Sequence, residues 1–179
     1  MLIFSVIIFL IVIIILLFSS KTLSPIPYFP SQPVDIPLII KALGLKKDQT
    51  VIDLGAGDGI VIFEAAKLSF QKKINTKFIA VEINPILILI LNIRRFFHPN
   101  RDNIRIIYDD IFKINIKDQK SKTIYLYISP WFLEKTIKNL KLKIENFDVV
   151  SYMYPIKSLN KKERFIQGKN KIFIYSGNS

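Results

Sequence analysis

The chain begins with a continuous apolar segment and then alternates short apolar runs with amphipathic stretches. Residues 1–18 carry no charged side chain, and as a helix they would span ~27 Å, about one hydrocarbon core of a bilayer. The first basic residue is Lys21, so the basic n-region of a signal peptide is missing, as is a small-residue cleavage site. We therefore predict an uncleaved transmembrane helix over residues 1–20. Because all side-chain positive charge follows it, the positive-inside rule predicts a single-pass membrane protein with its folded domain on the cytoplasmic side.

Residues 21–33, KTLSPIPYFPSQP, are punctuated by proline, which predicts an extended linker rather than a helix. Residues 34–179 follow as one predicted domain, because this length is enough for a single core and too short for two ordinary domains.

Within this domain, apolar runs that predict strands alternate with helical patterns. The predicted strands cover residues 50–55, 77–83, 103–112, 122–129 and 147–154, and the predicted helices cover residues 34–45, 58–70, 84–97 and 130–144. This order predicts an α/β fold with a mostly parallel sheet covered on both faces. The tail around GKNK predicts a C-terminal antiparallel hairpin. The stretch ILILIL (86–91) also alternates like a strand, but we predict a helix because a parallel sheet needs a crossover there.

Charge and composition limit the classes of partner and of metal site that the chain could have. The net charge is +12, spread along the chain, so a basic face could bind nucleic acid or anionic lipid, or could simply follow from a composition rich in Ile, Lys and Asn. We favour a solvated surface with some attraction to lipid and place nucleic acid second. The chain has no Cys and a single His98, so no thiolate or histidine-rich metal site is predicted.

The first predicted strand runs into TVIDLGAGDG, residues 50–59, where glycines occupy every second position of the turn. The dinucleotide fingerprint G-x-G-x-x-G would need glycine where Ile60 stands, and no Walker G-K-[ST] follows. A helix N-terminus beside glycine amides favours pyrophosphate, but Asp53 and Asp58 in the same turn would oppose it. S-adenosylmethionine fits better, since it has no phosphate and carries a sulfonium and an ammonium that a carboxylate can accompany.

Further acids follow the next two strands. Glu82 ends the second strand, where it could accept hydrogen bonds from both ribose hydroxyls of such a ligand. Asp109 and Asp110 follow the third strand, where one of them could accept from the adenine amino group. Ligands of open α/β sheets bind outside the carboxyl ends of the strands, so these acids and the glycine turn are expected to share one site.

The segments VIDLGAGDG, AVEINP and YDDIFKINI together resemble class I S-adenosylmethionine-dependent methyltransferases. With PIPYFPSQP, YISPWFLEKTIKNLKLKI and VVSYMYPI added, the resemblance narrows to the membrane-anchored protein-lysine N-methyltransferases that modify the ATP synthase c subunit and the adenine nucleotide translocase, with their prokaryotic relatives. It implies a Rossmann-like domain over residues 34–179, S-adenosylmethionine as cofactor, and a protein lysine as methyl acceptor. The cofactor-binding residues expected are Asp53, Gly55, Ala56, Gly57, Asp58, Gly59, Glu82, Asn84, Asp109 and Asp110.

The acceptor side is less defined by the sequence. Ser129, Pro130 and Trp131 follow the fourth strand, in the slot where amino-group methyltransferases often carry an Asn or Asp, two prolines and an aromatic residue, and we take them as substrate-pocket candidates. Tyr127, Tyr152 and Tyr154, at the ends of the fourth and fifth strands, are further candidates, with packing in the core as their alternative role. No general base stands out. A further hypothesis is that Tyr28 and Phe29 of the linker close over the site. The alternatives left open are a lipid, a quinone or RNA as acceptor, and an inactive S-adenosylmethionine-binding module.

Overall fold

The computed structural model describes residues 2–19, 28–114, 121–141 and 146–177. The helices are α1 (Leu2–Ser19), α2 (Ile36–Leu43), α3 (Ile60–Gln71), α4 (Pro85–Phe96) and α5 (Pro130–Lys141), with 3-10 turns η1 (Pro33–Asp35), η2 (Arg101–Asn103) and η3 (Lys157–Lys162). The strands are β1 (Thr50–Leu54), β2 (Lys77–Glu82), β3 (Ile104–Tyr108), β4 (Lys122–Leu126), β5 (Phe147–Tyr152), β6 (Glu163–Gln167) and β7 (Lys171–Tyr175).

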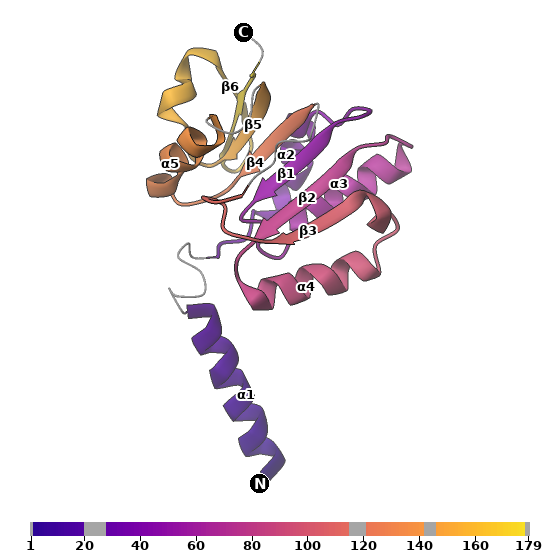
Figure 1. Ribbon diagram of the computed structural model, residues 1–179, viewed down its shortest axis with the longest axis vertical. Coiled ribbons are helices and arrows are strands. Elements are labelled where there is room, and N and C mark those ends of the chain that lie inside the picture. The colour runs from indigo at the N-terminus through magenta and orange to yellow at the C-terminus, as the bar shows by residue number, and fades with distance from the viewer. Residues whose placement is uncertain (1, 20–27, 115–120, 142–145, 178–179) are drawn as a thin grey trace.

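All seven strands form one sheet in the order β3-β2-β1-β4-β5-β7-β6 (Figure 1). The first five pair in parallel, and the β6–β7 hairpin adds two antiparallel strands beside β5. The predicted Rossmann-like α/β fold with a C-terminal antiparallel hairpin is therefore confirmed. Because the strand order reverses between β1 and β4, the carboxyl ends of these strands form the place where such sheets bind ligands.

Two apolar clusters cover the sheet. Every residue of β1 and of β4 is buried, as expected for central strands with helices on both faces. Alternate residues of the strands divide between the clusters: Val51 packs with α2 and α3, whereas Ile52 packs with α5. The core therefore lies on both sides of the sheet and leaves its carboxyl edge free to carry polar groups.

The alternating stretch 86–91 is helical, as predicted. Pro85 occupies the first turn of α4, and the Asn84 side chain caps it by accepting hydrogen bonds from the backbone N–H groups of Ile86 and Leu87 at 2.9 and 3.4 Å. A start signal of this strength, together with the need for a parallel crossover, outweighs the strand-like alternation of β-branched residues.

The predicted transmembrane helix over residues 1–20 is wrong. Among residues 2–19, 28–114, 121–141 and 146–177, no helix has both the length and the apolar character required to cross a membrane. Helix α1, which lies apart from the sheet in Figure 1, contains 18 residues. The predicted single-pass membrane localisation, with the folded domain on the cytoplasmic side, depended on this anchor and is wrong for the same reason.

Most of the predicted linker, residues 21–27, lies outside the described residues. Its last part, residues 28–33, runs across the carboxyl edge of the sheet, where the candidate site lies.

Candidate active site

A pocket of about 720 Å³, including the open solvent at its mouth, lies at the carboxyl edge of the parallel strands. Its walls come from the loops after β1, β2, β3 and β4 and from residues 28–31. Seven of the predicted site residues, at the strand ends or in these loops, line it: Asp53, Gly55, Ala56, Gly57, Asp58, Glu82 and Asp110. The sequence prediction that three successive strands deliver their acids to one place is thus matched by the geometry.

The glycine turn after β1 takes a backbone path that other residues rarely adopt. Gly57 has φ +60°, and a Cβ atom added to it would lie 2.5 Å from the ring of Tyr28. Gly59 has φ +76°, and a Cβ there would lie 2.5 Å from the side chain of Leu91. Glycine is required at both positions because the conformation is left-handed and the space is already filled. The turn therefore presents bare backbone to the pocket.

Glu82 ties this turn to the start of α4. It is buried, and its Oε2 accepts a hydrogen bond from the Gly57 N–H at 2.9 Å. Its Oε1 accepts from the N–H groups of Ile83 and Asn84 at 2.8 and 2.9 Å. A carboxylate has about four lone-pair sites, and these three N–H groups occupy three of them, so Oε2 still has capacity for a further donor such as a hydroxyl.

Asp53 is in the opposite situation. It ends β1 with only 3 % of its surface exposed, it lines the pocket, and no hydrogen bond to its carboxylate occurs within the described part of the chain. Burial, followed by the nearby charges of Glu82 and Asp58, raises the pKa of the Asp53 carboxyl well above its usual value. A buried carboxyl of this kind is satisfied when a cation or a hydrogen-bond donor enters the pocket.

Asp58 already has its partners. The Nη1 atom of Arg94 donates to its Oδ2 at 3.0 Å and to its carbonyl oxygen at 2.7 Å. Burial, followed by the charge of the neighbouring Asp58, raises the pKa of the Tyr28 hydroxyl to about 12. Of the two aspartates in the glycine turn, Asp53 is therefore the one available to a cationic ligand.

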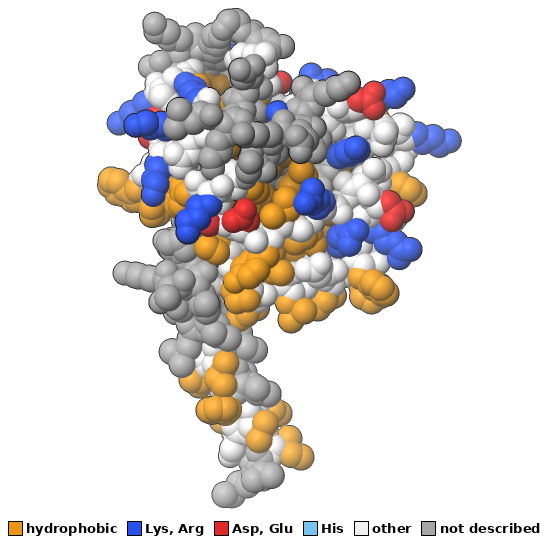
Figure 2. Space-filling model, viewed as in Figure 1, with side chains coloured by type: hydrophobic (Ala, Val, Ile, Leu, Met, Phe, Trp, Pro, Cys, Tyr) orange, Lys and Arg blue, Asp and Glu red, His pale blue; other side chains and the backbone are white. Residues whose placement is uncertain are grey.

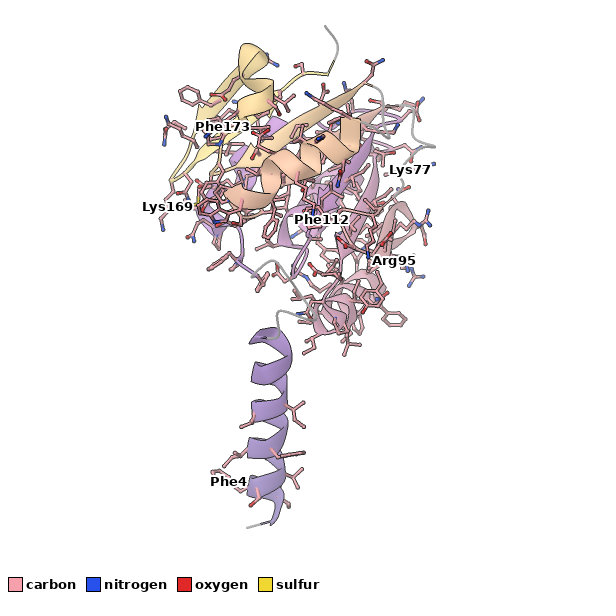
Figure 3. All side chains as sticks on the ribbon, turned by 60° about the vertical axis from the view of Figure 1, so that its left-hand side comes forward. Phe4, Lys77, Arg95, Phe112, Lys169 and Phe173 are labelled. Atoms are coloured by element: carbon pink, nitrogen blue, oxygen red, sulfur yellow. The ribbon has the colours of Figure 1, made fainter. Side chains whose placement is uncertain are left out.

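The two acids after β3 separate as well. Asp109 Oδ1 accepts from the N–H of Asp110 at 2.7 Å, so this side chain shapes the turn, and it does not line the pocket. Asp110 does line it, with Oδ1 accepting from the Phe112 N–H at 2.9 Å. Phe112, labelled in Figure 3, borders the same part of the pocket and packs on Phe132 of α5 with ring centroids 5.7 Å apart.

The opposite wall is aromatic. Tyr28 and Phe29 line the pocket together with Tyr125 and Tyr127, and the Ser31 hydroxyl is hydrogen-bonded to the Tyr125 hydroxyl at 2.8 Å. From the sequence, Tyr28 and Phe29 were a hypothesis and Tyr127 was a pocket candidate, but sequence reasoning missed Tyr125 and its pairing with Ser31. The signal was the Pro-flanked PYFPS segment, but the pairing joins residues 94 positions apart, which no local pattern reveals.

The three substrate-pocket candidates lie beside this wall and do not line the pocket. Trp131 stands in the first turn of α5 with 86 % of its surface exposed, and Pro130 is exposed. Ser129 is partly buried, and its carbonyl accepts from the Phe132 N–H at 2.9 Å. Gly59 and Asn84 likewise lie outside the lining and act on the backbone as the N-caps of α3 and α4. The roles of these residues toward a ligand stay predictions.

No protein-family model matches the chain. A curated relative, the lysine N-methyltransferase of the ATP synthase c subunit from Xenopus laevis, is 21 % identical over 151 residues, and the chain spans 63 % of its length. A second, the protein-lysine N-methyltransferase of Saccharolobus islandicus (strain REY15A), is 30 % identical over 142 residues, which are 77 % of this chain and 83 % of that protein. The chain belongs to the protein-lysine N-methyltransferase family. The family resemblance and the methyltransferase class expected from the sequence are therefore confirmed.

Solved structures agree with this family fold. An RNA methyltransferase from Salinibacter ruber in complex with S-adenosylhomocysteine has a TM-score of 0.70 at 18 % identity, covering 83 % of this chain and 94 % of that one. An S-adenosylmethionine-dependent O-methyltransferase from Thermotoga maritima has a TM-score of 0.60 at 13 % identity, covering 89 % and 70 %. The predicted cofactor, S-adenosylmethionine, is confirmed at the level of this fold. One of these methyltransferases holds S-adenosylhomocysteine, the demethylated form of the cofactor.

The residues at this site fit that cofactor. A buried carboxyl at Asp53 suits its ammonium or sulfonium, Glu82 has acceptor capacity for a ribose hydroxyl, and Asp110 can accept from the adenine amino group. The glycine turn leaves room for the backbone to approach the methionine part.

Proposed function

We propose that this chain transfers a methyl group from S-adenosylmethionine to the side-chain amine of a lysine in a protein. Membership of the lysine N-methyltransferase family supports the acceptor class. The observation that carries the proposal is the composition of the pocket, in which a buried carboxyl without a hydrogen-bond partner among the described residues faces an aromatic wall. Residues 34–179, with residues 28–33 closing the pocket, are the proposed catalytic domain.

When bound, S-adenosylmethionine supplies an electrophilic methyl group on a positively charged sulfur. The carboxylate of Asp53 would offset positive charge in the pocket, Glu82 would accept from a ribose hydroxyl, and Asp110 would accept from the adenine amino group. Residues that hold the cofactor in this way would contribute by positioning, which supplies much of the rate acceleration in a displacement reaction.

The acceptor amine has to be neutral when it reacts. A lysine has a reference pKa of about 10.4, so only about one in 2,500 is neutral at pH 7. The aromatic wall of Tyr28, Phe29, Tyr125 and Tyr127 desolvates the amine and so favours its neutral form. The same rings can hold the methylated, cationic product through cation–π contact. Ser129, Pro130 and Trp131 are proposed to contact the acceptor outside the pocket.

RNA and small molecules remain the competing acceptors. Figure 2 shows Lys and Arg side chains scattered over one face of the molecule rather than gathered into a stripe, which gives no specific support to a nucleic-acid track. The alternative that is not an enzyme is an inactive module, which would bind S-adenosylmethionine in the pocket without transferring its methyl group.

The test is to incubate the full chain with methyl-labelled S-adenosylmethionine and a whole-cell extract. Label should enter protein and be recovered as methyl-lysine after hydrolysis and mass spectrometry. Asp53→Asn should reduce the label strongly, whereas Asp102→Asn, an exposed acid on η2, should not. Label in lipid or RNA alone would contradict the lysine proposal, and no label despite cofactor binding would indicate the module.

A further inference from the structure

Arg94 connects the far end of α4 to the cofactor turn. It lies in the last turn of the helix, three turns from the residues that follow Glu82. Its Nη1 atom donates both to the carbonyl oxygen and to Oδ2 of Asp58, at 2.7 and 3.0 Å. The two side chains are 33 % and 29 % exposed, so the pair is largely covered. One nitrogen therefore holds the backbone and the side chain of the same residue.

Asp58 is the part of the turn that most needs such a hold. It stands between Gly57 and Gly59, which both adopt positive φ, so the backbone on either side of it has the conformational freedom of glycine. The hydrogen bond from the Gly57 N–H to Glu82 fixes one side, and the Ile60 N–H fixes the other by donating to Asp58 Oδ1 at 3.2 Å. Arg94 fixes the residue in between.

Arg94 is itself held in place. Its guanidinium carbon lies 4.9 Å from the centroid of the Phe63 ring on α3. That ring packs against His98, with centroids 5.5 Å apart, and the His98 Nε2 atom lies 3.0 Å from the Phe63 carbonyl oxygen. A cation over an aromatic face and between two helices loses less freedom on pairing than a surface lysine does. The contact with Asp58 is thus pre-organised.

We propose that Arg94 is a positioning residue of the methyl-donor site. It fixes the Gly57–Asp58 backbone that faces the cofactor, and it neutralises Asp58 so that Asp53 is left as the carboxylate for the positive charge of the ligand. The inference rests on the proposed function only in that the turn binds S-adenosylmethionine. It assigns Arg94 an effect on cofactor affinity and none on the affinity for the acceptor.

The test compares three substitutions of Arg94 in the full chain, with S-adenosylhomocysteine as the ligand in isothermal titration. Arg94→Ala and Arg94→Met should weaken binding by at least about tenfold, the loss expected when a hydrogen bond between charged groups is removed. Arg94→Lys should restore most of the affinity, because one nitrogen makes both contacts. The matched control is Arg105→Ala, which removes the same charge from an exposed position on β3.

Thermal unfolding of each variant separates positioning from folding. A purely structural role would lower the unfolding temperature of Arg94→Ala and leave the affinity of the folded protein within about twofold, a change too small for a lost charged contact. That result, or an equal loss of affinity in Arg105→Ala, would overturn the inference. If the wild-type chain binds no S-adenosylhomocysteine, the inference and the proposed function both fail. If it binds and Arg94→Ala weakens binding but no lysine is methylated, only the proposed function fails.

Discussion

The two halves of the carboxyl edge are built in different ways. Around the ends of β1, β2 and β3, acidic side chains other than Asp53 are tied to backbone N–H groups, as Glu82 is to Gly57, Ile83 and Asn84. After β4 and β5, the edge consists of aromatic side chains held by partners distant in sequence. Tyr152, for example, donates to Asp35, 117 residues away, at 2.7 Å. The first half is a pre-organised binding surface for polar groups, and the second is an apolar wall whose shape depends on the whole fold.

The largest effect is expected from Glu82→Ala. The change leaves the Gly57, Ile83 and Asn84 N–H groups without their carboxylate acceptor and removes the proposed ribose contact. Loss of several charge-assisted hydrogen bonds should weaken S-adenosylhomocysteine binding about 100-fold. Isothermal titration measures this, with Glu64→Ala on the exposed face of α3 as control. If Glu82→Ala and Glu64→Ala bound S-adenosylhomocysteine equally well, the acidic half would not be the binding surface for the cofactor.

Gly57→Ala is expected to have the next largest effect. The new methyl group would be strained at φ +60° and would displace the Tyr28 ring, so cofactor affinity should fall by roughly the factor of ten that 1.4 kcal/mol represents. Gly44→Ala is the matched control, because its φ is +57° but its Cβ would meet only the Ala42 carbonyl at 4.0 Å. It should cost about 1 kcal/mol of stability, measured by urea unfolding, and leave the affinity unchanged.

How much of each half follows from sequence reflects this construction. The alternation of strands and helices, the glycine turn and the positions of Glu82 and Asp110 were predictable because strand, turn and acid are adjacent in the chain. The contacts that hold the aromatic wall were not, since Ser31 reaches Tyr125 and Asp35 reaches Tyr152 only through the folded sheet.

The sequence also could not show that neighbouring acids have different partners. Spacing shows that Asp53 and Asp58 are close in the chain, but only the fold shows that Asp58 is paired with Arg94. The transmembrane prediction rested on the apolar run alone and was wrong, because no helix of the described residues has both the length and the apolar character needed to cross a membrane.

A several-fold effect is expected in the aromatic half. Tyr127 lines the pocket, packs edge-on against Tyr152 at 4.8 Å between centroids, and its hydroxyl donates to the Met153 sulfur at 3.7 Å. Tyr127→Ala should raise the KM for the acceptor several-fold, about what a lost aromatic contact represents, without changing cofactor affinity. Trp131→Ala, at an exposed position beside the pocket, should have the smaller effect in steady-state kinetics. The reverse ranking would indicate that the acceptor contacts Trp131 more than it contacts the aromatic wall.

The smallest effect concerns stability and pH. The folded state raises the pKa of Asp53, so its contribution to stability is complete below the unfolded pKa and is lost as the pH rises through the folded value. Asp53→Asn does not titrate and should therefore gain stability relative to the wild type as the pH increases from about 4. Urea unfolding across the pH range measures this difference. A constant difference between the two proteins would show that the carboxyl is not held in an unfavourable site.

The most direct test of the methyl-donor site is equilibrium binding of S-adenosylmethionine to the wild-type chain and to Asp53→Asn. Asn keeps the shape of the side chain and removes only its charge. The account predicts one cofactor per chain and an affinity at least about tenfold lower in the variant, because the buried carboxylate is the partner of the ligand's positive charge. Absence of binding to the wild type, or equal affinity of the two proteins, would contradict it.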